Sequence, residues 1–238
     1  MALAANLAAV QKRIETACAR VGRDPASVTL LAASKSQPPE TVRAAAELGV
    51  HLFGENKVQE AKAKVLLCAG ALRWHMIGHL QTNKCREAVE LFDMIQSVDS
   101  LRLAEELNQR AHQASKTVPV LLEVNVAGEA SKFGYQPDKL LEELERINAL
   151  KRIEVQGLMT IAPWTADPER VRPVFRQLRD LKRRCEQVLD APLAHLSMGM
   201  SGDYEVAVEE GATIIRIGAA LFGTRTRGRQ TKEPEESA

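Results

Sequence analysis

The chain alternates eight times between a short apolar run and a longer segment with apolar residues at helical spacing, without a break in composition that would mark a second domain. Short, nearly continuous apolar runs are typical of parallel strands that are buried on both faces. Eight such units in 238 residues predict one (β/α)8 barrel of the TIM type, with a doubly wound open sheet as the alternative. The predicted strands are 28–34, 51–54, 73–77, 94–98, 118–126, 154–161, 193–198 and 213–217.

An extra helix is predicted before the first strand, over residues 3–21, because apolar positions recur there at helical spacing. We expect residues 1–223 to form the barrel domain and the polar residues 224–238 to form a disordered tail. The N-terminal segment lacks the basic start of a signal peptide, and no run is long enough for a membrane helix. We therefore expect a cytoplasmic protein without a membrane partner.

Charge and cysteine content narrow the partners further. The 32 Lys+Arg against 31 Asp+Glu give a formal net charge of +1, which provides no field to attract nucleic acid or an anionic membrane. The four cysteines lie far apart, without a paired spacing or a nearby histidine, so we expect them to be reduced and buried and no metal to be bound. These features favour a small-molecule partner.

A single lysine stands at the end of the first predicted strand. The run VTLLAASKS, residues 28–36, includes Lys35 and is stopped by Gln37 and two prolines. Barrels keep their chemistry at the C-terminal ends of their strands. A partly desolvated lysine has a lowered pKa and can be a neutral amine that forms a Schiff base. The alternative is a lysine that only ends the strand and reaches water.

Two loops with small residues follow the last two predicted strands. Ser201 and Gly202 precede a helical pattern, and Gly218 and Ala219 open a short helical turn. Backbone N–H groups with small side chains at a helix start bind anions, and barrels often use these two loops for phosphate. The loops therefore predict a phosphate site.

Arg216 interrupts the apolar eighth strand. A buried guanidinium keeps its proton and needs an acceptor, which is either a ligand or a carboxylate such as Glu123. Closure of the barrel places this strand beside the first one and therefore near Lys35. A Schiff-base lysine, a phosphate site and an arginine in one pocket suit pyridoxal 5'-phosphate (PLP), a phosphorylated aldehyde. An aldolase-type enzyme, in which Lys35 binds a sugar phosphate, is the alternative.

Other motifs are weaker. GMSGD at 199–203 resembles the hydrolase elbow G-x-S-x-G, but Asp203 replaces the last glycine, so we reject Ser201 as a nucleophile. His75 and His79 lack an acidic third ligand in sequence, which favours packing or hydrogen bonding over metal binding. Tyr135 follows the fifth strand in a loop, where packing is favoured over a role as acid or base.

Together the motifs resemble the pyridoxal phosphate homeostasis proteins of the YggS/PROSC type. They extend from residue 28 to residue 223 and are VTLLAASKSQPPETV, HLFGENKVQEAKAK, RWHMIGHLQTNK, IQSVDS, VNVAGEASKFGY, GLMTIAP and LSMGMSGDYEVAVEEGATIIRIGAALFG. The resemblance implies a fold like the N-terminal barrel of alanine racemase. It implies that Lys35 holds PLP, that Ser201 and the backbone around Gly218 hold the phosphate, and that Arg216 faces the pyridine nitrogen.

The resemblance also implies that Asn56 and Ser197 line the cofactor ring. Departures from the family pattern are small: Ala32 and Ser36 stand where valine and threonine are expected, and Lys57 stands where tyrosine is common. None of these removes an expected cofactor contact.

The implied function is PLP homeostasis without catalytic turnover. An arginine at the pyridine nitrogen cannot accept a proton, so the ring stays a weak electron sink. Alanine racemase takes its second base from a second domain and partner subunit, whereas this sequence ends with the barrel. The alternative is a PLP-dependent amino-acid racemase that uses Lys35 and Tyr135. We expect a monomer whose partners are PLP and the apo-enzymes that receive it.

Overall fold

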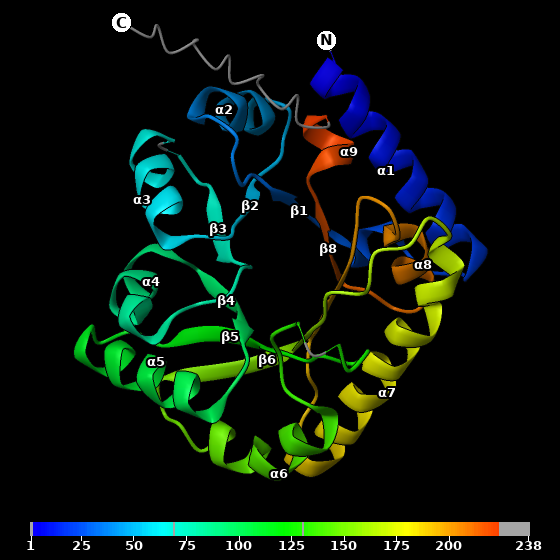
Figure 1. Ribbon diagram of the computed structural model, residues 1–238. Coiled ribbons are helices and arrows are strands. Elements are labelled where there is room, and N and C mark those ends of the chain that lie inside the picture. Colours follow the sequence, from blue (N-terminus) through cyan, green and yellow to red (C-terminus); the bar gives the residue numbers. More distant parts are fainter. Residues whose placement is uncertain (1, 69, 130, 224–238) are drawn as a thin grey trace, which may run out of the picture.

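The computed structural model describes residues 2–68, 70–129 and 131–223. Its strands close into one parallel barrel in sequence order, with β8 paired to β1, and the helices surround it (Figure 1). The predicted (β/α)8 barrel is therefore confirmed, and the predicted tail, 224–238, lies outside the described residues. The strands are β1 (Thr29–Ala33), β2 (Leu52–Glu55), β3 (Arg73–Met76), β4 (Met94–Val98), β5 (Val118–Glu123), β6 (Ile153–Met159), β7 (His195–Met200) and β8 (Ile214–Ile217).

The helices alternate with the strands, and one additional helix precedes β1. They are α1 (Ala2–Arg20), α2 (Pro39–Glu47), α3 (Val58–Leu67), α4 (Cys85–Leu91), α5 (Leu101–Gln113), α6 (Pro137–Asn148), α7 (Arg172–Leu189), α8 (Tyr204–Glu209) and α9 (Ala219–Phe222), with short 3-10 turns η1 (Pro25–Ser27), η2 (Thr82–Lys84) and η3 (Pro168–Val171). The predicted N-terminal helix is confirmed as α1, which packs against α8 and α9 (Figure 1).

Side chains that alternate along the strands separate two apolar layers. The outer layer lies between the sheet and the helices and holds most of the core. The interior of the barrel is filled by a smaller cluster of Leu31, Ala33, Leu52, Ile77, Met94, Leu121, Met159 and Ile214. Because the interior is a packed core rather than a pore, polar chemistry is confined to its C-terminal mouth and to the few polar side chains inside.

The end of the fifth strand differs from its predicted position for an identifiable reason. The fifth strand was expected to reach residue 126, but β5 ends at Glu123. Beyond it, Asn125 turns the chain by bonding Glu129 through both its amide oxygen and its amide nitrogen.

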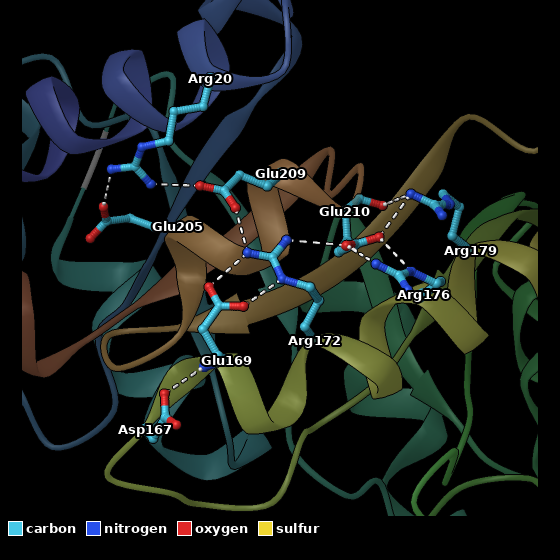
Figure 2. A network of polar contacts seen from close by, with 9 residues as sticks. All are labelled: Arg20, Asp167, Glu169, Arg172, Arg176, Arg179, Glu205, Glu209 and Glu210. Carbon is cyan, nitrogen blue, oxygen red and sulfur yellow. Dashed lines mark hydrogen bonds and ion pairs between the residues drawn. The ribbon is translucent and has the colours of Figure 1, made fainter.

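A network of ion pairs and hydrogen bonds joins α8 to α7 and α1 (Figure 2). It contains Arg20, Asp167, Glu169, Arg172, Arg176, Arg179, Glu205, Glu209 and Glu210. Glu210 is buried and accepts hydrogen bonds from Arg172 at 3.1 Å, Arg176 at 3.0 Å and Arg179 at 2.9 Å. Burial would raise the pKa of Glu210, but the arginine hydrogen bonds outweigh it, so its pKa lies below the usual value. Since α8 directly follows Ser201 and Gly202, the network also fixes that loop.

The Glu210→Gln variant should lose about 2–3 kcal/mol of unfolding free energy at neutral pH, because three guanidinium groups lose one charged acceptor. The pKa of Glu210 is lowered on folding, so this contribution is present at neutral pH and is lost as the pH falls through the folded value. Urea unfolding of Glu210→Gln beside Glu169→Gln, an exposed partner of Arg172, tests this. The control should lose clearly less, because solvent screens the exposed Glu169 pair, and equal losses would contradict the account.

Candidate functional site

The two predicted phosphate loops meet at the mouth of the barrel. Ser201 follows β7, and Gly218 precedes α9 at the end of β8. The Ser201 hydroxyl oxygen accepts a hydrogen bond from the backbone N–H of Ala220 at 3.1 Å, which joins the loops. Gly202 and Ala219 are exposed beside this contact. Backbone N–H groups and a hydroxyl therefore converge where the sequence predicted an anion site.

Lys35 lies beside these loops because β1 and β8 are neighbouring strands. The register pairs Leu31 with Arg216 and Ala32 with Ile217. Lys35 itself follows the strand, in a turn, and its side chain is exposed. The expected position at a strand end next to β8 is confirmed, but the expected burial of the lysine is wrong, because the chain leaves the sheet after Ala33.

Arg216 is buried and is held by two interior acceptors. Its Nη1 donates to Ser197 Oγ at 2.8 Å, and its Nη2 donates to the carbonyl oxygen of Thr160 at 2.8 Å. The expectation that Arg216 needs an acceptor is confirmed. Its hydrogen-bonding partners are a hydroxyl and a carbonyl oxygen, however, and Glu123 acts on Arg216 only through its charge.

The hydrogen bonds of Arg216 continue across the barrel through Ser197. The Ser197 hydroxyl donates to Gln96 Oε1 at 2.6 Å, and the Gln96 amide lies 2.8 Å from His75 Nδ1. Burial lowers the pKa of His75 to about 3, so His75 is neutral and its Nδ1 can accept from the amide. Ser197, which was expected to line a cofactor ring, is thus hydrogen-bonded on both sides by protein groups.

Arg216 keeps its positive charge although it is buried. Burial lowers its pKa to about 10, against the opposing influence of the Glu123 and Asp203 charges. The guanidinium is therefore protonated at neutral pH, and it can donate a hydrogen bond but cannot take up a proton. Any ring nitrogen that meets this side chain faces a donor.

Glu123 is a buried acid at the end of β5. The sequence suggested it only as a partner for Arg216. Burial and the nearby Asp99 charge raise its pKa to about 7, while Arg216 opposes the shift. Its side chain lines a cavity of about 280 Å³ at the barrel mouth, together with Asn56 and Asn125. The structure therefore places Asn56 on the rim of this cavity and adds Glu123 as a titrating group.

Asn56 and the chain after β3 pack closely. A Cβ atom at Gly78 would lie 2.5 Å from the carbonyl oxygen of Asn56, so only glycine fits there. His79 directly follows Gly78. Its Nδ1 lies 3.1 Å from Asp99 Oδ2, and its ring stacks on the Phe133 ring with the two ring centroids 3.7 Å apart. Both histidines of the motif are thus used for hydrogen bonding and packing, as the sequence predicted.

Several other expectations are settled by burial. Tyr135 is buried in the outer apolar layer, where burial raises its pKa. The four cysteines are buried and free, as expected. Within residues 2–68, 70–129 and 131–223, no cluster of three or more histidine, cysteine or acidic side chains suits a metal ion, and no helix could cross a membrane.

The fold and the site define the class of protein to which the chain belongs. The family model described as "Alanine racemase, N-terminal domain" matches residues 2–226. An alanine racemase from Clostridium difficile 630 has the same barrel, with a TM-score of 0.70 at 16% identity over 95% of this chain and 58% of that one. At this identity the similarity concerns the fold alone.

Relatives of similar length specify the family. Two curated proteins named pyridoxal phosphate homeostasis protein, from Aquifex aeolicus and Pseudomonas aeruginosa, are 46% and 43% identical over 92% and 95% of this chain, and 97% of each relative is covered. PipY of Synechococcus elongatus PCC7942, solved with PLP bound, has a TM-score of 0.82 at 39% identity, covering 93% of this chain and all of PipY. The chain therefore belongs to the pyridoxal phosphate homeostasis protein family.

Replacing Glu123 by glutamine should make stability less dependent on pH. The pKa of this carboxyl is raised on folding from 4.5 to about 7, so the native state loses stability as the pH rises through that window. The loss is at most about 3 kcal/mol for the wild type. Urea unfolding at about pH 5 and about pH 8 should show Glu123→Gln gaining relative to wild type at the higher pH. Glu142→Gln, on the exposed side of α6, is the control, and a similar gain in it would contradict the assignment.

Proposed function

We propose that this protein binds PLP as a Schiff base on Lys35 and serves cytoplasmic PLP homeostasis without catalytic turnover. The observation that carries the proposal is the pairing of β1 with β8, which sets Leu31 beside Arg216 and brings the turn of Lys35 to the same end of the barrel as the joined loops of Ser201 and Gly218. In this proposal the protein is a monomer that passes the cofactor to apo-enzymes. The PLP bound in the 39% identical PipY supports the choice of ligand.

The residues at the barrel mouth suit the parts of PLP. The exposed amine of Lys35 is accessible to the aldehyde. Ser201 Oγ accepts from Ala220, so its own proton is free to be donated to a phosphate oxygen. Gly202 adds no side chain, and a Cβ there would meet nothing within 4 Å, which leaves space for the anion. Gly218 and Ala219 add backbone groups on the opposite side of the Ser201 contact.

A carrier fits the protein groups better than a racemase does. When bound, PLP supplies an aldehyde that captures an amine and a ring that withdraws electrons. Arg216 would meet the ring nitrogen as a donor that stays protonated, so it leaves that nitrogen without a proton and the ring a weak electron sink. Tyr135, the base of the racemase alternative, is buried in the outer apolar layer.

The absorbance spectrum tests the proposal and separates it from an aldolase that needs no cofactor. Wild-type protein mixed with PLP should gain the visible band of a Schiff base, and borohydride should attach the cofactor to the peptide that contains Lys35. Lys35→Ala should lose both signals, while Lys62→Ala, which removes an exposed lysine of α3, should keep them. An unchanged spectrum in the wild type would contradict the proposal, and so would equal labelling of Lys35→Ala.

A carrier should not exchange the α-proton of an amino acid. We expect the PLP-loaded protein, incubated with alanine in deuterium oxide, to show no exchange above that of free PLP, as measured by NMR. The reason is that Arg216 keeps the ring a weak electron sink and that Tyr135 is buried in the outer apolar layer. Exchange that depends on Lys35 would instead establish the racemase alternative.

A further inference from the structure

The turn that carries Lys35 has an unusual backbone. The N–H of Gln37 donates to the carbonyl oxygen of Ser34 at 3.0 Å, so Lys35 and Ser36 are the two central residues of a four-residue turn. Ser36 has φ 64°, a left-handed conformation that residues other than glycine adopt infrequently. Such a backbone persists where surrounding contacts hold it.

One end of the turn is held by a buried lysine of α3. Lys64 Nζ donates to the carbonyl oxygen of Ser34 at 2.6 Å and to Glu55 Oε1 at 2.7 Å. The Ser34 hydroxyl donates to the same Glu55 oxygen at 2.6 Å. Ser34 and Glu55 are both 0% exposed and Lys64 is 6% exposed. The residue before Lys35 is thus fixed through its main chain and its side chain.

The other end of the turn, at Ser36, is held by a second residue on the same face of α3. The N–H of Ser36 donates to Glu60 Oε2 at 3.3 Å. Glu60 and Lys64 are four residues apart, so their side chains lie on one face of α3. The two contacts therefore flank Lys35 on either side, and we call Glu60 and Lys64 the α3 clamp.

Stability alone gives little reason for a buried ion pair at this place. An apolar pair of similar volume is often as stable as a buried ion pair, because desolvation offsets the attraction. Glu55 Oε2 is buried and has no hydrogen-bond partner among the described residues, which adds a further cost. The Lys64–Glu55 pair does, however, orient the chain at Ser34. Leu31 and Ala33 face the barrel interior, so anchoring Ser34 toward α3 leaves the following residue, Lys35, on the side of the barrel mouth.

We propose that Lys64 and Glu60 are positioning residues that hold the Lys35 amine in place for capture of the cofactor aldehyde. In that step the neutral amine nitrogen forms a double bond to the aldehyde carbon, and the aldehyde oxygen leaves as water with the two amine protons. The α3 clamp touches neither reactant and acts through the turn. The identity of the aldehyde rests on the proposed function, whereas the orientation of Lys35 does not.

The test uses the full chain and charge-matched variants. Lys64→Met alone leaves Glu55 buried without its partner, so the main variant is Glu55→Gln with Lys64→Met, which removes both charges and can fold. Glu60→Gln tests the second contact. Lys62→Met, on an exposed position of α3, is the matched control. Thermal unfolding without PLP verifies that each variant is folded.

Two readouts separate the clamp from the cofactor. The first is the rate of Schiff-base formation with PLP, followed by absorbance across a pH series. The second is acetylation of Lys35 by an amine-reactive ester, followed by mass spectrometry, which needs no cofactor. In the double variant we expect PLP capture to slow about tenfold or more, with a changed pH profile and a changed acetylation rate at Lys35. Glu60→Gln should show smaller changes in the same direction, and Lys62→Met should match wild type.

Each result of these two measurements either supports or contradicts the proposed role of the α3 clamp. A folded double variant whose PLP capture and Lys35 acetylation both equal those of wild type would overturn the clamp. A wild type that never captures PLP would overturn the proposed function, and a changed acetylation rate in the double variant would then still support the clamp. A loss of thermal stability with unchanged Lys35 reactivity would show a purely structural role and would also overturn it.

Discussion

The site depends on one buried positive charge and on the acceptors that hold it. Arg216 stands in a strand that is otherwise apolar, and two neutral oxygens, one from Ser197 in β7 and one from Thr160 directly after β6, accept its hydrogen bonds. The Ser197 hydroxyl in turn donates a hydrogen bond to Gln96, and the Gln96 amide donates one to His75. The lowered pKa of His75 keeps its ring neutral and able to accept. A single guanidinium thereby sets the hydrogen-bonding roles of side chains from three other strands across the barrel interior.

The groups around the mouth are fixed by separate parts of the outer layer. The Ser201 loop leads into α8, whose acidic residues are held by arginines of α7 and α1 (Figure 2). The Lys35 turn is held by α3 through Lys64 and Glu60. The anion side and the amine side of the site are therefore supported independently. In the proposed function, each side would hold one end of the phosphorylated aldehyde.

Periodicity was sufficient to predict the barrel, because buried parallel strands and amphipathic helices each leave a repeated pattern. It also located Lys35, Ser201 and Arg216, since strand order alone places β1 next to β8. It could not identify the acceptors of Arg216, which depend on how β6, β7 and β8 are staggered across the barrel. Glu123 was the obvious charge partner in sequence, whereas the geometry supplies Ser197 and Thr160.

Two further features were not predictable from local pattern. No local pattern marks Lys64 as a buried residue, and it is the contacts of α3 with Ser34 and Glu55, after β1 and at the end of β2, that bury it. The exposure of Lys35 depends on a turn closed by Ser34 and Gln37, with Ser36 in a left-handed conformation that its residue type does not indicate. The first feature arises from contacts between segments distant in sequence, and the second from a local turn whose two ends are held by α3.

A crystal structure of the protein grown with PLP tests the central claim most directly. The account predicts density that is continuous from Lys35 Nζ to the cofactor, the phosphate between Ser201 and Gly218, and Arg216 at the ring nitrogen with its bond to Ser197 retained. Cofactor density that joins a different lysine, or a phosphate placed away from the Ser201 and Gly218 loops, would contradict it.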